Sequence, residues 1–183
     1  MERKMGEAVA RVARKVNETV ENRADFLDLA DCKLMTFPIA LYKVMRHVSE
    51  GIHLITLANN ELKAVTSKFI ITFSQLRELN LEGNYLHRLP EEVRTLSHLR
   101  VINLSRNKFQ HFPEQLTSLQ ALETINLEEN EIAVQILWPA SFGTLCLCKE
   151  HHVSHGSIST LEHVSRIKSR TSLMNNNFLP TLM

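Results

Sequence analysis

The sequence predicts an α/β solenoid, in which a curved parallel sheet forms the concave face and helical or 3₁₀ turns form the convex face. Three observations lead to this prediction. An apolar pattern recurs at intervals of 23 to 28 residues, asparagine recurs at a fixed place in that pattern, and proline opens several of the joining segments. Such a period is typical of solenoids, in which each repeat buries its apolar face only against its neighbours.

Residues 1–23 are predicted to form an amphipathic helix that caps the first repeat. Val9, Val12, Val16 and Val20 recur three or four residues apart, so they lie on one stripe of a helix. A targeting presequence would also be amphipathic, but it would be poor in acids, and four glutamates lie in this segment. We therefore expect a cap rather than a targeting signal.

Residues 24–132 carry five repeats, each with an alternating LxL-type core. The segments are ADFLDLADCKLMTF, IHLITLANNELKAV, LRELNLEGNYLHRL, LRVINLSRNKFQHF and LETINLEENEIAVQ. The alternation turns both apolar residues to one face of a short strand, so each repeat should add one strand to a parallel sheet. The remaining strand residues should point outward, onto the concave face.

The ninth position of each repeat follows the strand, where the chain must turn. An asparagine amide there both donates and accepts, so it can satisfy backbone groups of neighbouring turns. We predict a structural ladder at this position, formed by Cys32, Asn60, Asn84, Asn107 and Asn130. Cys32 offers only a weak donor, which fits an end repeat and a reduced thiol.

The joining segments are predicted to form the convex wall. Pro90 and Pro113 open the segments LPEEVRTLSHL and FPEQLTSLQAL. Proline is harmless at such a start because the first N–H has no helical partner, and its fixed φ favours a helical or 3₁₀ turn. FPIALYKV at 37–44 begins in the same way. The segment after it is longer than in the other repeats, which accounts for the 28-residue interval between the first two repeats.

LRELNLEGNYL and LRVINLSRNKF follow the pattern LxxLxLxxNxL almost literally. In this the chain resembles the leucine-rich repeat family, in the subclass with 23-residue LPxxΦxxLxxLxxLxLxxN units found in intracellular proteins. The resemblance covers about residues 24–132. It implies a protein-binding solenoid that acts as a scaffold, with no cofactor and no catalysis.

Beyond Ile132 the chain departs from the family's pattern, because the expected further repeat is missing. Residues 133–183 are predicted to be a non-repeat tail, in which 133–148 folds as an improvised cap and 149–183 is disordered. We interpret the shift as an alternative carboxyl end. The chain is expected to be a monomer that would self-associate if the last repeat were uncapped. A truncated variant without a function of its own is an alternative.

The tail also offers ligands of the kind that zinc prefers, and these give an alternative function as a metal-responsive or redox module. They are Cys146, Cys148, His151, His152 and His155. A CxC pair followed by adjacent histidines differs from the CxxC spacing of a closed structural site. We therefore expect no metal site, no cofactor and no enzyme activity.

The composition bears on partners and location. The 21 basic and 20 acidic residues give a net charge of +1, which provides no overall field for nucleic acid or an anionic membrane. Three cysteines would leave one unpaired under oxidising conditions, and nothing at the start resembles a secretion signal. A cytoplasmic, reducing location is expected, with no membrane contact.

The remaining candidate site is the concave face, where an unidentified protein partner is expected to bind. Its predicted residues are Phe26, Leu54, Arg77, Glu78, Asn80, Tyr85, Arg100, Val101, Asn103 and Arg106. Phe26, Leu54, Tyr85 and Val101 are the predicted anchors, because solubility explains the charged residues more easily than exposed apolar ones.

Overall fold

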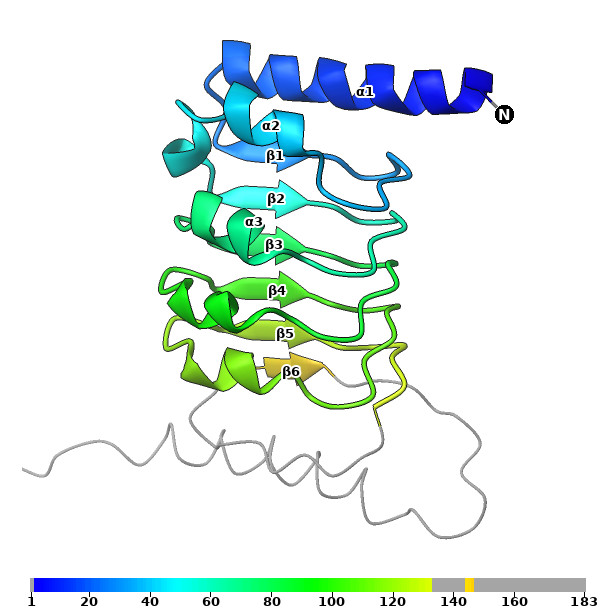
Figure 1. Ribbon diagram of the computed structural model, residues 1–183. Coiled ribbons are helices and arrows are strands. Elements are labelled where there is room, and N and C mark those ends of the chain that lie inside the picture. The colour runs from blue at the N-terminus through cyan, green and yellow to red at the C-terminus, as the bar shows by residue number, and fades with distance from the viewer. Residues whose placement is uncertain (1, 133–143, 147–183) are drawn as a thin grey trace, which may run out of the picture.

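The computed structural model describes residues 2–132 and 144–146, with side chains described for residues 9–132. Parallel strands stack in chain order, each beside the strand of the next repeat (Figure 1). They are β1 (Phe26–Asp28), β2 (Leu54–Thr56), β3 (Glu78–Asn80), β4 (Val101–Asn103), β5 (Thr124–Asn126) and β6 (Thr144–Cys146). The predicted solenoid is confirmed.

The register repeats without a slip along the sheet. The central residue of each strand pairs with the central residue of the next, as Leu27 does with Ile55 and Ile55 with Leu79. The central residues of β1–β5 are buried, and the flanking residues are partly or fully exposed. This is the alternation that the LxL pattern predicts.

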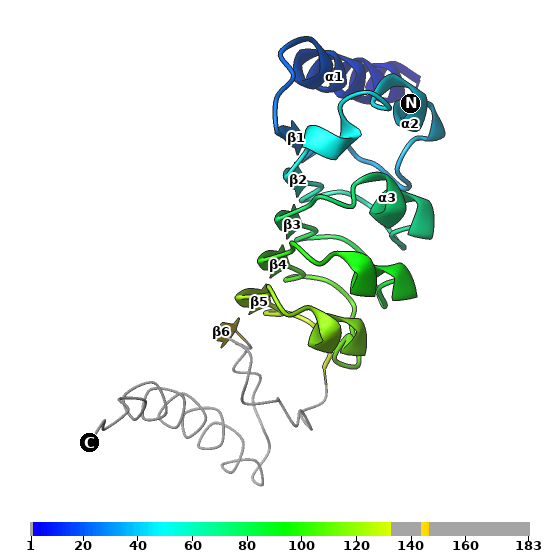
Figure 2. The ribbon, with the colours of Figure 1, turned by 90° about the vertical axis from the view of Figure 1, so that its left-hand side faces the viewer.

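The convex segments lie on the other side of the core from the strands (Figure 2). They are α2 (Ile39–Val44), η1 (Ser49–Gly51), α3 (Ser67–Thr72), η2 (Glu91–Thr95) and η3 (Glu114–Ser118). Pro38, Pro90 and Pro113 stand immediately before α2, η2 and η3. The hydroxyl of Thr66 accepts a hydrogen bond from the Phe69 amide at 3.2 Å and so caps α3.

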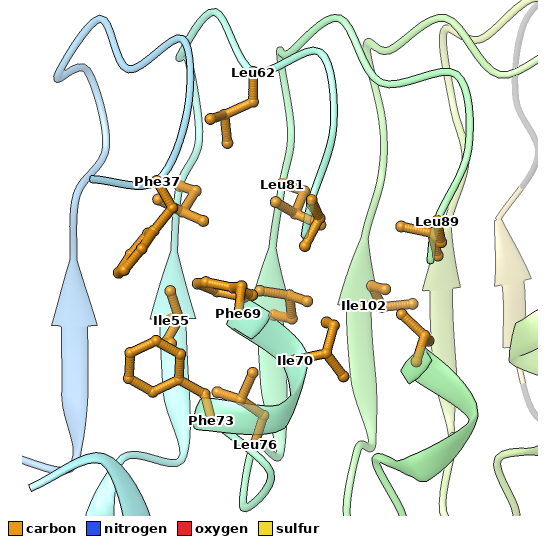
Figure 3. Close-up of a cluster of buried hydrophobic side chains, with 14 of the residues drawn as sticks. Phe37, Ile55, Leu62, Phe69, Ile70, Phe73, Leu76, Leu81, Leu89 and Ile102 are labelled. Atoms are coloured by element: carbon orange, nitrogen blue, oxygen red, sulfur yellow. The ribbon is translucent and has the colours of Figure 1, made fainter. Parts of the chain in front are cut away.

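The core fills the space between the sheet and these segments (Figure 3). Phe37 of the first repeat forms an aromatic cluster with Phe69 and Phe73 of the second, and its ring centre lies 5.0 Å from that of Phe69 and 5.8 Å from that of Phe73. Edge-on contacts of this kind add to the stabilisation from area burial. These rings lie in the two repeats whose convex segments contain an α-helix, α2 or α3, where the later repeats have the 3₁₀ turns η2 and η3.

The predicted cap is α1 (Glu2–Glu21), which packs over β1. Val12 and Val16 are buried, whereas Val9 on the same stripe is 67% exposed. The helix extends past the carboxyl end of β1, so its N-terminal turns have no strand beneath them (Figure 1). Thr19 is also buried, and its hydroxyl lies within hydrogen-bond distance of the carbonyls of Lys15 and Phe26.

The sheet differs from the sequence prediction at its carboxyl end. Strand β6 pairs in parallel with β5, and Leu145 lies opposite Ile125. It begins 20 residues after the equivalent residue of β5, so it is out of step with the preceding 23-residue interval. The rest of the predicted cap and tail lies outside the described residues.

Candidate functional site

The asparagine ladder fixes the turns that follow the strands. The Asn84 amide nitrogen donates to the carbonyls of Leu57 and Leu81, both at 2.9 Å, and its oxygen accepts from the Leu62 amide at 3.0 Å. Leu57 and Leu62 belong to the preceding repeat. Each ladder amide therefore joins its own turn to the turn before it.

The same bonds recur in the neighbouring repeats. The side chains of Asn60, Asn107 and Asn130 donate to the carbonyls of Leu29, Leu81 and Leu104, one repeat back, and each accepts from a backbone amide of that same repeat. Asn60, Asn84 and Asn107 are buried. Since an unmade buried hydrogen bond is expensive, this column holds the strands in register.

Cys32 stands at the same position in the first repeat, which packs against α1 on the side where the other repeats pack against a preceding repeat. Its thiol lies 3.3 Å from the carbonyl of Ala30, and burial raises its pKa. The turn is completed by α1 instead. The Arg11 guanidinium donates to the Asp31 carbonyl at 3.0 Å, and the Lys15 ammonium donates to the Ala30 carbonyl at 3.4 Å.

A second column of polar contacts closes each strand. The last residue of every strand from β1 to β5 accepts a hydrogen bond from the backbone amide two residues on. These residues are Asp28, Thr56, Asn80, Asn103 and Asn126. Asn80 and Asn103 are predicted from the sequence to contact a partner, and this hydrogen-bonding role is not among the predictions. The sequence does indicate it, because every residue in this column is an Asp, Asn or Thr, whose short side chain accepts hydrogen bonds from nearby backbone amides in turns.

A third regularity is a left-handed backbone one residue before the ladder position. The residues are Asp31, Asn59, Gly83, Arg106 and Glu129, with φ between 53° and 65°. Arg106, predicted to contact a partner, lies in this turn. Its guanidinium bonds to the Asn59 side chain at 2.6 Å and the Glu82 carboxylate at 3.1 Å, so its charge is already paired.

The predicted anchors Phe26 and Leu54 come together. They are the first residues of β1 and β2 and are paired in the sheet register. Phe26 is 50% exposed and Leu54 is 36% exposed, so a substantial apolar area faces solvent. Val101 begins β4 on the same face and is half-buried.

The predicted charged residues take different positions. Glu78 begins β3, between Leu54 and Val101 in register, and it is exposed. Neither Glu78 nor Arg77 forms a side-chain ion pair or hydrogen bond with another residue of the described range. Arg100, by contrast, is paired with Glu123 at 2.9 Å.

Tyr85 lies in the loop between β3 and η2 rather than on a strand. It is 49% exposed, and its backbone amide donates to the carbonyl of Leu62. Lys108 is the equivalent of Tyr85 in the next repeat. Its ammonium pairs with the Glu131 carboxylate at 3.2 Å, and that contact is the main cause of the lowered pKa of Glu131. The structure thus separates Tyr85 from the strand anchors.

The tail ligands of the alternative function are not brought together by the part of the structure that is described. Cys146 ends β6, with its side chain undescribed, and Cys148, His151, His152 and His155 lie outside the described residues. Among the residues that are described, no three histidines, cysteines or acids cluster as a metal site would require. None of the helices within that range is both long and apolar enough to cross a membrane.

Comparison with known proteins agrees with this geometry. Residues 74–132 match the family described as leucine rich repeat. Over 93 residues the chain is 77% identical to leucine-rich repeat-containing protein 20 of Mus musculus and 76% identical to that of Homo sapiens. These alignments cover 51% of this chain and 50% of each relative. The chain therefore spans about half the length of the curated relatives it matches.

Solved structures give the same fold. A leucine-rich repeat protein of Leptospira interrogans aligns with a TM-score of 0.50 and 25% identity, over 64% of this chain and 30% of that one. The leucine-rich repeat domain of a Shigella effector aligns with a TM-score of 0.57 and 20% identity, over 74% of this chain and 54% of that one. The architecture is a leucine-rich repeat solenoid.

Proposed function

We propose that this chain is a non-catalytic interaction module that binds a protein partner on the concave face. The observation that carries the proposal is the exposed apolar pair of Phe26 and Leu54, set side by side on adjacent strands. Exposed apolar side chains that are grouped and rimmed by polar residues mark interaction sites more often than isolated ones do.

The rigidity of the face supports the proposal. Each strand is held at its end by the ladder amides and by the hydrogen bond of its own last residue. A surface fixed in this way loses little conformational entropy when a partner docks. The leucine-rich repeat resemblance points to the same class of function, since such solenoids serve as interaction modules.

The charged groups of this face favour binding over catalysis. Arg100 pairs with Glu123 and Arg106 with Glu82, in partly exposed contacts. A catalytic centre needs a nucleophile or base beside a group that stabilises developing charge, converging on one point. Paired surface charges of this kind provide solubility and a pattern for recognition.

We also propose a cytoplasmic location. Cys32 is a buried free cysteine, and a thiol in that state is typical of proteins kept in a reducing compartment.

The proposal is tested by co-purification of the tagged chain from cells. The double variant Phe26→Glu and Val101→Glu should lose the partners that the wild-type chain retains, because buried unpaired charges oppose docking. The matched control is Ile39→Glu with Ile71→Glu, on the convex helices, where the two side chains are 75% and 64% exposed. An unchanged partner list for the concave variant, with both proteins melting normally, would contradict the assignment.

A further inference from the structure

The first residues of β1–β5 form a series across the concave face, which we call the first-residue column. In register order it consists of Phe26, Leu54, Glu78, Val101 and Thr124. Neighbouring strands are about 4.8 Å apart, so the column sets the spacing of any chain that lies across the strands.

The column begins with its apolar pair. A single partner side chain that covers both Phe26 and Leu54 must lie between them, about 2.4 Å from each along the column. Because Phe26 is half exposed, that contact removes apolar area of both residues from water at once.

Glu78 comes next, about 7 Å from the midpoint of the pair. Its carboxylate is exposed and has no ion-pair partner in residues 9–132, whereas Glu82 and Glu123 of the same face are neutralised by arginines. An unpaired carboxylate beside an apolar patch attracts a cationic side chain and disfavours an acidic one.

An extended peptide matches these distances. Side chains on one side of an extended chain recur every two residues, or about 6.7 Å. An apolar residue over the pair therefore places the residue two positions along over Glu78. The residue four positions along lies about 13 Å from the first, close to the half-buried Val101, which lies about 12 Å from the pair midpoint along the column.

We propose that the first-residue column binds an extended segment of the partner, with an aromatic or aliphatic residue, a lysine or arginine two positions away, and a small apolar residue four positions away. The pattern applies in either chain direction. This inference rests on the proposed function, because it names the chemistry of the partner at the same face.

The test uses the purified full chain and a displayed library of random nine-residue peptides. We expect the enriched sequences to share an apolar residue and a basic residue two positions apart. Binding of the best synthetic peptide, measured by fluorescence anisotropy, should be lost with Phe26→Ser plus Leu54→Ser and unchanged with the convex control Ile71→Ser. Glu78→Lys should weaken it by about tenfold and should favour the same peptide with glutamate in place of its basic residue.

The outcomes separate this inference from the proposed function. Peptides that depend on Phe26 and Leu54, but show no basic preference and no response to Glu78→Lys, would overturn the inference and leave the proposed function standing. A library that yields no peptide dependent on these residues also overturns the inference, and the co-purification experiment then decides the proposed function by itself. Circular dichroism melting of each variant identifies any that fails to fold, and Glu78→Gln is the milder substitution in that case.

Discussion

The ladder and the first-residue column are built from the same repeats, yet they differ in regularity. From the second repeat to the fifth, the ladder holds one residue type with nearly the same hydrogen bonds. The first-residue column has a different residue in every repeat. The stability of this solenoid therefore depends on the ladder, which is the same in successive repeats, and recognition is expected to depend on the first-residue column, which differs between them.

The ladder asparagines all bond toward the preceding repeat, which explains why the first repeat has Cys32 at this position instead. Each amide bonds to the preceding repeat, as Asn84 does to Leu57, whereas the first repeat has α1 on that side. Cys32 occupies that position, and basic residues of α1 bond the turn carbonyls. The helix therefore takes over the contacts that a preceding repeat would make.

The largest effect on stability is expected for Asn107→Ala. It removes the donor to the Leu81 and Leu104 carbonyls and the acceptor of the Leu86 amide, all buried. Because each unsatisfied buried group costs about 1–3 kcal/mol, we expect a loss of about 3–5 kcal/mol in the free energy of unfolding. Urea denaturation measures it, with Asn103→Ala in the same repeat as control, for which about 1 kcal/mol is expected. Equal losses would remove the distinction between the two columns.

The next largest effect is expected at the cap. Val16 is buried between α1 and the first repeat, so Val16→Ala should lower the free energy of unfolding by about 2 kcal/mol. Val9 belongs to the same stripe but is exposed, and Val9→Ala should change stability by less than about 0.5 kcal/mol. Thermal melting of both variants tests whether α1 stands in for a missing repeat. Similar shifts would argue against that role.

Gly83→Ala is expected to have a smaller effect, of about 1–2 kcal/mol. Gly83 has a φ of 65°, and an added Cβ would lie 2.6 Å from the side-chain oxygen of Asn59. Chemical denaturation of the variant measures the cost. Gly51→Ala is the control, because that glycine has open space around its Cβ position. If both substitutions were neutral, the left-handed turn would not be a constraint shared by the repeats.

The smallest effect on stability, and the largest relative effect on binding, is expected on the first-residue column. Phe26→Ser removes a half-exposed side chain and should cost less than about 1 kcal/mol of unfolding free energy. The same variant should bind the peptide selected by the wild-type chain far more weakly. Melting and anisotropy on one preparation check both expectations, and a protein that loses both together would show that Phe26 acts mainly in folding.

The strands could be predicted from the sequence because two independent patterns indicate them, the alternation of apolar residues within each LxL core and the regular interval between repeats. Leu79 and Leu81 had to face inward, and every predicted LxL core lies in or next to an observed strand. Strand β6 could not be predicted, because its TLC segment follows β5 at a shorter interval and no ladder asparagine marks it.

The candidate site was less predictable, because the sequence pattern does not show which side chains are already bonded to other residues of the chain and which are available to a partner. Arg77 and Arg106 cannot be distinguished by residue type alone. Arg106, however, lies in a left-handed turn, and its guanidinium bonds to Asn59 and Glu82. Tyr85 was grouped with the strand anchors, but it belongs to the loop after β3. Only the backbone conformation separates such residues, and sequence spacing alone does not give it.

Site-specific photo-crosslinking distinguishes a partner bound on the concave face from one bound on the convex face. A benzophenone side chain is placed at Leu54 on the concave face or at Ile71 on the convex face, and each tagged chain is irradiated in cells that contain the partner. We expect a covalent adduct with one protein from the Leu54 position and none with that protein from the Ile71 position. Adducts from Ile71 alone would place the binding surface on the opposite side of the solenoid and would rule out the concave face as the binding site.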